Sequence, residues 1–181
     1  DALWVNQYVP STLQWEQRGV TIEQDGEFPQ SSSTTFTVKT TQKQHFALNL
    51  LIPSWAEKAS ISINGKKTSV KVTGKARYHT ISRKWKDGDK VQLHLQGGFK
   101  IHHLQGDCQT IAISYGPMLL AFIENDKIEL QLTEHQLLNN LQATDASKGI
   151  FTLNHNGKQY TLRPLFDVDD ETYSVYVQLK P

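Results

Sequence analysis

The chain has 181 residues, enough for one large domain or two small ones with a sizeable hydrophobic core. Its 19 basic and 18 acidic residues leave a net charge of +1, so no field of one sign favours nucleic acid or an anionic membrane surface. The longest apolar run, residues 118–123, is too short to cross a bilayer, and we expect neither nucleic acid nor a membrane as a partner.

The first half of the chain alternates apolar and polar residues with period two, the pattern of a strand with one buried face. It predicts strands or extended segments at residues 3–9, 11–15, 20–23, 35–40, 46–52, 61–63, 68–72, 78–85 and 91–95. Pro53 cannot donate to a sheet ladder, so we expect the strand from Phe46 to end there and Trp55 to begin a loop. The stretch from Phe46 to Leu95 is therefore predicted to form an antiparallel sheet.

Turn-forming residues separate these strands. Asn64-Gly65 tolerates positive φ at both positions and predicts a two-residue hairpin. Asp25-Gly26 and Asp87-Gly88 mark further turns, and the polar residues 31–33 indicate a solvated connection. Gln96-Gly97-Gly98 is the clearest candidate for a domain boundary, because two glycines after a strand supply a flexible link.

The second half continues with strands and one helix. Strands are predicted at residues 110–115 and 118–123 around a Gly116-Pro117 turn, and at 150–153 and 160–162 around Asn156-Gly157. Leu137, Leu138 and Leu141 fit one helical face, with Thr133 as the N-cap. The last predicted strand, residues 173–179, places Tyr173, Val175, Val177 and Leu179 on one face.

These elements predict an all-β chain of antiparallel, jelly-roll-like β-sandwich domains with at most one short helix. We expect two domains in tandem, a middle sandwich at residues 1–97 and a C-terminal sandwich-like domain at residues 98–181.

The titratable residues do not predict a catalytic or metal site. His102 and His103 are neighbours in a predicted strand and would point to opposite faces, whereas a metal needs several converging ligands. The cluster Asp167, Asp169, Asp170 and Glu171 lacks the glycine of a calcium loop, so a solvated turn is the favoured interpretation and a calcium site the alternative. Cys108 is the single cysteine and cannot form an internal disulfide. We expect neither catalytic residues nor a cofactor in this chain.

Carboxylates and aromatic residues are the other candidates for a site. Glu124, Asp126 and Glu129 are carboxylates whose separation the sequence leaves open. For Trp4 and Trp85 we favour a place in the sandwich core. Trp55 and Trp15 are the candidate contacts to carbohydrate or to another domain, and Trp55 is the stronger because it follows Pro53.

Several phrases resemble a known family. These are LWVNQYVPS at residues 3–11, LIPSWA at 51–56, ING at 63–65, ISRKWKDGD at 81–89 and IAISYGP at 111–117, followed by RPLF at 163–166 and DETYSVY at 170–176. In order and spacing they resemble the region after the catalytic barrel in the beta-L-arabinofuranosidase-like glycoside hydrolases (glycoside hydrolase family 127 and relatives). The resemblance extends over nearly the whole chain.

The resemblance implies an accessory region. Enzymes similar to this chain carry an α/α barrel with a cysteine nucleophile and a zinc held by cysteines and a glutamate, followed by β-sandwich domains. No catalytic residue can be transferred, because Cys108 lies in no matching motif. The zinc is therefore expected only in the missing N-terminal barrel, which would be the partner of this chain. The chain opens on a strand, as an excised fragment would, and a secreted or periplasmic location is compatible with the parent enzyme.

Two functions follow from the resemblance: packing on the barrel to shape its substrate cleft, or binding of plant-type arabinose glycans as a carbohydrate-binding module. An exposed, coplanar aromatic pair would favour carbohydrate, and a broad apolar face without a groove would favour barrel packing. An independent hydrolase is the least favoured interpretation.

Overall fold

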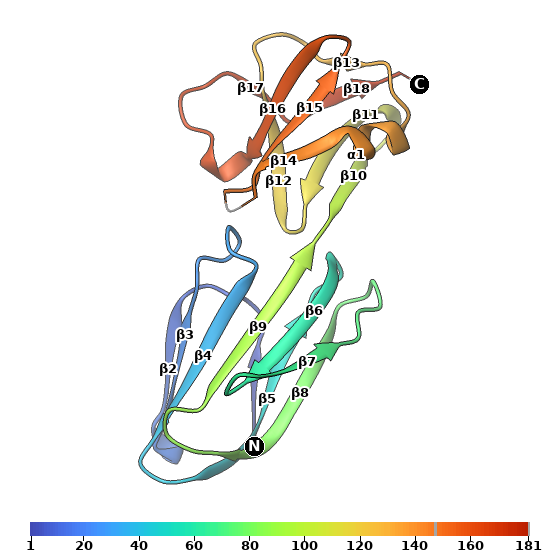
Figure 1. Cartoon of the computed structure of the whole chain (residues 1–181). Helices are drawn as coiled ribbons and strands as arrows, with labels where there is room; N and C mark the ends of the chain where they lie inside the picture. Colours follow the sequence, from blue (N-terminus) through green and yellow to red (C-terminus); the bar gives the residue numbers. More distant parts are fainter. Residues whose placement is uncertain (147, 181) are drawn as a thin grey trace. The chain divides into compact units, whose positions relative to one another are not determined.

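Figure 1 shows a computed structural model of the chain, which describes residues 1–146 and 148–180. Strands dominate these residues, and they contain one α-helix, α1 (Glu134–Asn140). The all-β class and the sandwich-like fold are therefore confirmed. By contacts between residues, the chain divides into two compact units, the first at Asp1–Gly97 and the second beginning at Gly98.

The first unit is a sandwich of two sheets. The three-stranded sheet has the order β1-β5-β8, and the six-stranded sheet has the order β2-β3-β4-β9-β6-β7 (Figure 1). The strands are β1 (Ala2–Val5), β2 (Ser11–Trp15), β3 (Val20–Asp25), β4 (Ser33–Thr40), β5 (Gln44–Ile52), β6 (Ala56–Ile63), β7 (Lys66–Val70), β8 (Arg77–Trp85) and β9 (Lys90–Gly97), with a short 3-10 helix η1 (Glu16–Arg18) after β2.

Alternating apolar residues of both sheets form the core of this unit. In β5, Phe46, Leu48, Leu50 and Ile52 are buried, as the period-two pattern predicts. Trp85 is fully buried, stacks on Phe46 with ring centroids 5.5 Å apart, and donates from Nε1 to the Phe46 carbonyl oxygen at 3.0 Å. The prediction that Trp85 lies in the core is confirmed.

Three details of the predicted sheet are wrong. The segment from Phe46 to Leu95 is divided between the two sheets, with β5 and β8 in one and β6, β7 and β9 in the other. β1 pairs with β5 in parallel, so the three-stranded sheet is mixed. The strand predicted at residues 68–72 is β7, Lys66–Val70. The alternating pattern shows which face of a strand is buried, but not which strand lies beside it, since pairing depends on contacts distant in sequence.

The strand predicted at residues 3–9 ends at Val5, because the chain then crosses from one sheet to the other. Tyr8 holds this crossing, residues 6–10, in place: its ring is buried against Phe28 and Phe36, and its hydroxyl donates to the Leu51 carbonyl oxygen. Burial raises the pKa of the Tyr8 phenol above its ordinary value.

The Asn-Gly hairpins are confirmed in both units. Asn64 and Gly65 have φ of 50° and 85° and join Ile63 to Lys66, its register partner. Asn156 and Gly157 have φ of 49° and 75° and connect β15 (Ile150–His155) to β16 (Lys158–Pro164) in the same way. Positive φ at both central residues is the geometry of a type I′ turn, whose twist matches that of the flanking strands.

A buried carboxylate links the first of these hairpins to the turn between β8 and β9. Asp89 is 1% exposed and accepts from Asn64 Nδ2 at 2.8 Å and from the Lys86 backbone N–H at 3.1 Å. Asn64 Oδ1 in turn accepts from the Lys90 backbone N–H at 2.8 Å. Arg83 Nη2 lies 3.6 Å from Asp89 Oδ2. Within RKWKDGD, residues 83–89, Trp85 therefore packs in the core and Asp89 connects the two turns by hydrogen bonds.

The environment of Asp89 favours its ionised form. Burial alone would raise the pKa of its carboxyl group, but the hydrogen bonds from Asn64 and Lys86 and the positive charges of Arg83 and Lys86 outweigh it. The pKa of Asp89 is therefore held below its usual range.

The strands among the described residues of the second unit form one sheet. In it β13, β18, β11, β12, β16, β15 and β14 are neighbours in that order, β10 pairs with β11, and β17 pairs with β12. The strands not given above are β10 (Phe99–Leu104), β11 (Asp107–Tyr115), β12 (Met118–Ile123), β13 (Glu129–Leu130), β14 (Leu141–Asp145), β17 (Tyr173–Ser174) and β18 (Val177–Leu179), with a 3-10 helix η2 (Leu165–Asp167). Its core includes Ile111, Leu120, Phe151 and Leu162.

The predicted helix is confirmed as α1, capped by Thr133. The place of Leu141 on its face is wrong, because the helix ends at Asn140 and Leu141 begins β14. The Thr133 hydroxyl accepts from the Gln136 backbone N–H at 3.3 Å, and Gln136 Oε1 accepts from the Thr133 backbone N–H at 2.9 Å. This capping box satisfies two backbone donors that the first helical turn leaves without partners.

The predicted strand at residues 173–179 is wrong. β17 pairs with β12, whereas β18 pairs with β11 and β13, and the chain bends between them. Ser174 Oγ donates to the Tyr176 carbonyl oxygen at 2.6 Å across this bend. Of the four residues predicted on one face, Val177 and Leu179 are buried and Val175 is partly buried, but Tyr173 is exposed, so the four do not share that face.

We predict that Gly65→Val lowers the free energy of unfolding by about 1–3 kcal/mol, because a β-branched residue is strained at positive φ. An added Cβ at Gly65 meets no atom within 4 Å, so backbone strain is the only cause. Gly65→Asn is the matched control, since Asn tolerates this region, and urea unfolding measures both variants. Equal stability of the Val and Asn variants would contradict a type I′ turn.

We predict that Asp89→Asn lowers the free energy of unfolding at neutral pH by about 1–3 kcal/mol, because an acceptor of two buried hydrogen bonds is partly replaced by a donor. The lowered folded-state pKa stabilises the fold above the unfolded pKa of about 3.9, and this contribution is lost as the pH falls through the folded pKa. Urea unfolding at neutral and at acidic pH measures this contribution. The free energy of unfolding should therefore fall less on acidification in the variant than in the wild type. The control is Glu57→Gln, at an exposed carboxylate; an unchanged acid effect in Asp89→Asn would contradict the assignment.

Candidate functional site

The exposed large hydrophobic residues of the first unit gather on one surface. Among its residues, all of which the structure describes, they are Trp4 (56% exposed), Val9 (52%), Leu13 (39%) and Tyr78 (40%). Trp4 and Tyr78 contact each other, and Trp4, Val9 and Leu13 line one groove. We call these four residues the β1 surface. Contiguous exposed apolar groups of this kind mark interaction sites more often than single exposed residues do.

The register of the three-stranded sheet brings Trp4 and Tyr78 together. Trp4 lies opposite Asn49 and Tyr78 lies opposite Leu51, so the two aromatic residues face each other diagonally across β5. Their rings meet edge to face, with centroids 4.6 Å apart and planes at 90°. Leu3 and Val5 pack against the core, so Trp4 between them points outward. The prediction that Trp4 lies in the core is therefore wrong.

Hydrogen bonds of Asn49 and of the Tyr78 hydroxyl lie next to the two rings. Asn49 is 3% exposed, donates from Nδ2 to the Leu3 carbonyl oxygen at 3.2 Å, and accepts from Thr80 Oγ1 at 2.6 Å. The Tyr78 hydroxyl donates to Asn6 Oδ1. The bonds of Asn49 connect all three strands of the sheet, and the bond to Asn6 holds the Tyr78 ring against which Trp4 packs.

A groove of about 300 Å³ lies beside β1, where the edge of the three-stranded sheet faces β2 and β3 of the other sheet. Ile22 and Phe36 of the core form part of its lining, together with Leu13 and Trp4 of the β1 surface. Asn6, Gln7, Ser11 and Gln24 add polar groups. None of the eleven lining residues is charged.

Gln24 is the buried polar group of the groove, with 8% of its surface exposed. Its Nε2 donates to the Val9 carbonyl oxygen at 2.7 Å and to the Gln7 carbonyl oxygen at 3.3 Å. Because both partners are acceptors, the amide nitrogen must face them, and the amide oxygen points away from the crossing. Sequence reasoning missed Gln24 because its burial depends on the crossing of residues 6–10 from one sheet to the other.

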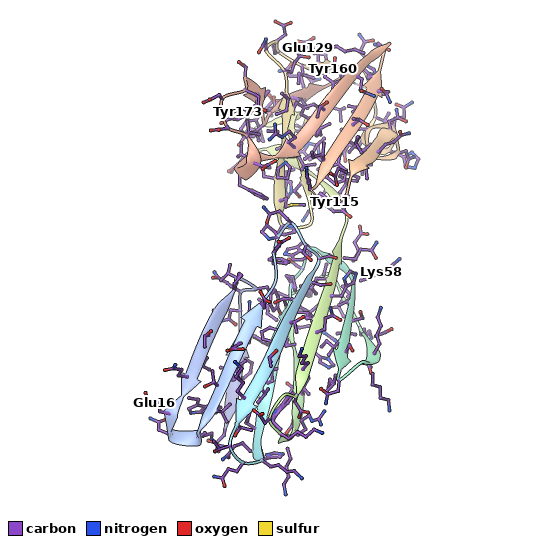
Figure 2. All side chains as sticks on the ribbon, turned by 60° about the vertical axis from the view of Figure 1, so that its left-hand side comes forward. Glu16, Lys58, Tyr115, Glu129, Tyr160 and Tyr173 are labelled. Carbon is purple, nitrogen blue, oxygen red and sulfur yellow. The ribbon has the colours of Figure 1, made fainter. Side chains whose placement is uncertain are left out.

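The predicted contacts Trp15 and Trp55 lie at opposite ends of the first unit. In Figure 2, Glu16, directly after Trp15, and Lys58, close after Trp55, mark those two ends. Trp15 is the last residue of β2, and its ring centroid lies 5.7 Å from that of Phe46. The Arg18 guanidinium lies 5.1 Å from the Trp15 ring centroid.

Trp55 lies in the turn between β5 and β6 and stacks on Phe28, with the two ring centroids 5.9 Å apart. Both tryptophans are partly buried against the core. Their contact with carbohydrate or with a barrel stays a prediction, and the structure does not bring them together.

The candidate carboxylates and histidines of the second unit make contacts of their own. Glu124 pairs with Lys158, Glu129 with Lys180 at 2.7 Å, and Arg163 joins Glu171 to Asp167. His102 Nε2 lies 2.8 Å from Ser114 Oγ, whereas His103 Nε2 lies 3.1 Å from Glu134. Within residues 1–146 and 148–180, no three His, Cys, Asp or Glu side chains gather to hold a metal ion. Cys108 is exposed, and no helix of the described residues has the length and hydropathy of a membrane span.

A comparison with protein families matches residues 2–97 to the model described as "Beta-L-arabinofuranosidase, GH127 middle domain". A comparison with curated proteins found no match.

Solved structures that share this fold include the following three. One is described as a glycoside hydrolase (TM-score 0.70, 17% identity over 98% of this chain and 36% of the other). Another is a GH127 beta-L-arabinofuranosidase from Geobacillus stearothermophilus T6 (TM-score 0.69, 20% identity over 99% of this chain and 34% of the other). A third is described as a GH127 beta-arabinofuranosidase (TM-score 0.69, 20% identity over 99% of this chain and 35% of the other). The chain thus spans about a third of the length of these structures.

We predict that the two tryptophans differ in their importance for folding. Trp55→Ala should lower the free energy of unfolding by about 2 kcal/mol or more, because it removes a partly buried ring from Phe28 and the core. Trp4→Ala loses mainly its contact with Tyr78 and should cost about 1 kcal/mol or less. Urea unfolding of both variants measures the difference, and an equal cost would contradict the exposed position of Trp4.

Proposed function

Because the chain belongs to the GH127 beta-L-arabinofuranosidase family, with residues 2–97 as its middle domain, we propose that it packs on the catalytic barrel of a longer glycoside hydrolase and shapes the substrate cleft of that barrel. The chain itself is a non-catalytic region of such a protein. In this proposal residues 98–181 form a second, C-terminal accessory domain.

The β1 surface is the observation that carries this proposal. Trp4 and Tyr78 are residue types that contribute most binding energy at protein interfaces. The Tyr78 hydroxyl is bound to Asn6, and the Trp4 ring packs edge to face against Tyr78. Val9 and Leu13 extend the apolar area beside them. A surface of this kind loses most of its contact with water when a second domain covers it.

The aromatic geometry favours a protein partner over a flat sugar chain. Trp4 and Tyr78 stand at 90°, so they do not offer the coplanar platform on which successive sugar rings could stack. A protein surface can place one side chain against each ring. The alternative, a carbohydrate-binding module for plant-type arabinose glycans, is supported by the uncharged groove beside Trp4 and by the names of the similar structures.

Catalysis is assigned to the barrel in this proposal. Covalent chemistry by a zinc-held thiolate needs several cysteines, and this chain has Cys108 alone. The zinc and the nucleophile would therefore belong to the barrel. The accessory region would form part of the wall of the substrate cleft and help to orient the substrate.

Reconstitution tests the proposal. The barrel expected in the coding sequence before Asp1 is produced separately, and its association with this chain is measured by calorimetry. We expect binding that Trp4→Ala weakens about tenfold or more, as for a residue at the centre of an interface.

The matched control is Tyr176→Ala, because Tyr176 is 57% exposed but lies in the second unit. Absence of binding by the wild-type chain would contradict barrel packing. Equal binding by the wild type and Trp4→Ala would remove the β1 surface from the interface.

A further inference from the structure

We propose that the groove beside β1 binds one neutral sugar ring. The inference goes beyond barrel packing and deepens the carbohydrate alternative, on which it rests for the choice of sugar. It assigns the contact to the groove residues Trp4, Ser11, Leu13 and Gln24 and not to Trp55 or Trp15.

The size of the groove suits a single ring. Its volume of about 300 Å³ is at the lower end of the range of small-molecule sites, about 300–1,000 Å³. It therefore has room for a monosaccharide or for the end of a glycan chain, but not for several residues of a chain.

The lining of the groove selects for a neutral ligand. Since none of its eleven residues carries a charge, a phosphate or a uronic acid would lose hydration without gaining a counter-charge. The lining combines apolar side chains, Leu13, Ile22 and Phe36 among them, with the polar side chains of Asn6, Gln7 and Ser11. A sugar ring has the same mixed character, with apolar C–H faces and hydroxyl edges.

Gln24 supplies an acceptor whose amide oxygen is accessible from the groove. Its amide nitrogen is occupied by the carbonyl oxygens of Gln7 and Val9, which turns its amide oxygen away from them. No hydrogen bond to that oxygen occurs among the described residues, so it is available to a donor from a ligand. A sugar hydroxyl satisfies it, whereas a purely apolar side chain inserted from another protein would bury it without a partner.

Trp4 closes the site at its rim. Its indole is about half exposed and is fixed by its edge contact with Tyr78, so one ring face can pack on the C–H face of a sugar that enters the groove. A single ring needs one stacking residue, and the perpendicular position of Tyr78 does not oppose this.

Saturation-transfer NMR on the isolated chain, without a barrel, tests the proposal with three probes. These are methyl β-L-arabinofuranoside, D-galactose and the charged D-glucuronate. We expect saturation transfer to the neutral sugars and weaker transfer to glucuronate. No transfer to either neutral sugar, or equal transfer to glucuronate, would overturn the proposal.

Two variants locate the binding. Ser11→Phe fills the groove, because Ser11 is the register partner of Gln24, and should abolish binding. Thr12→Phe is its matched control, since the next residue along β2 points to the opposite face and is exposed. Trp4→Ala should weaken binding about tenfold.

Circular dichroism and unfolding curves confirm that each variant is folded. Binding by Ser11→Phe at wild-type affinity would overturn the groove as the site. Since the barrel is absent from this experiment, its outcome is independent of the outcome of the packing experiment.

Discussion

The site on this protein depends on the crossing from the three-stranded sheet to the six-stranded sheet at residues 6–10. Backbone groups that leave a sheet lose their ladder partners and must find others. Here the Gln24 side chain binds the carbonyl oxygens of Gln7 and Val9, and the Tyr8 hydroxyl binds that of Leu51. The crossing therefore stays close to the core while leaving β1 and β2 as the edges of two different sheets. The groove lies between those edges, and Trp4 stands at its rim.

A second constraint stabilises the far side of the same unit. Asp89 receives hydrogen bonds from Asn64 and from the Lys86 backbone, so the β6–β7 hairpin and the β8–β9 turn are held by one carboxylate. The β8–β9 turn also reaches β4, since Gly88 donates to the Val38 carbonyl oxygen at 2.9 Å. These contacts give a structural reason for the phrases ING and RKWKDGD, on which the family resemblance partly rests: they join turns and fill the core.

Barrel packing and sugar binding would both use Trp4. The two proposals are compatible if one face of the indole contacts the barrel while the groove remains open beside it. In that arrangement a groove at the border of two domains would hold a sugar near the substrate cleft, which is where small-molecule sites commonly lie. If the barrel covers the groove completely, sugar and barrel would compete, and affinity for the sugar would fall when the barrel is present.

Features with local causes could be predicted from the sequence. Asn64-Gly65 and Asn156-Gly157 produce their turns through the φ angles that these residues tolerate, and Thr133 begins its helix by capping neighbouring backbone groups. The all-β class followed from period-two alternation. Tertiary structure alone decided the parallel pairing of β1 with β5, the bend between β17 and β18, the exposure of Trp4 and the burial of Gln24. Each of these depends on which distant strand lies alongside, and alternation along one strand carries no information about its neighbour.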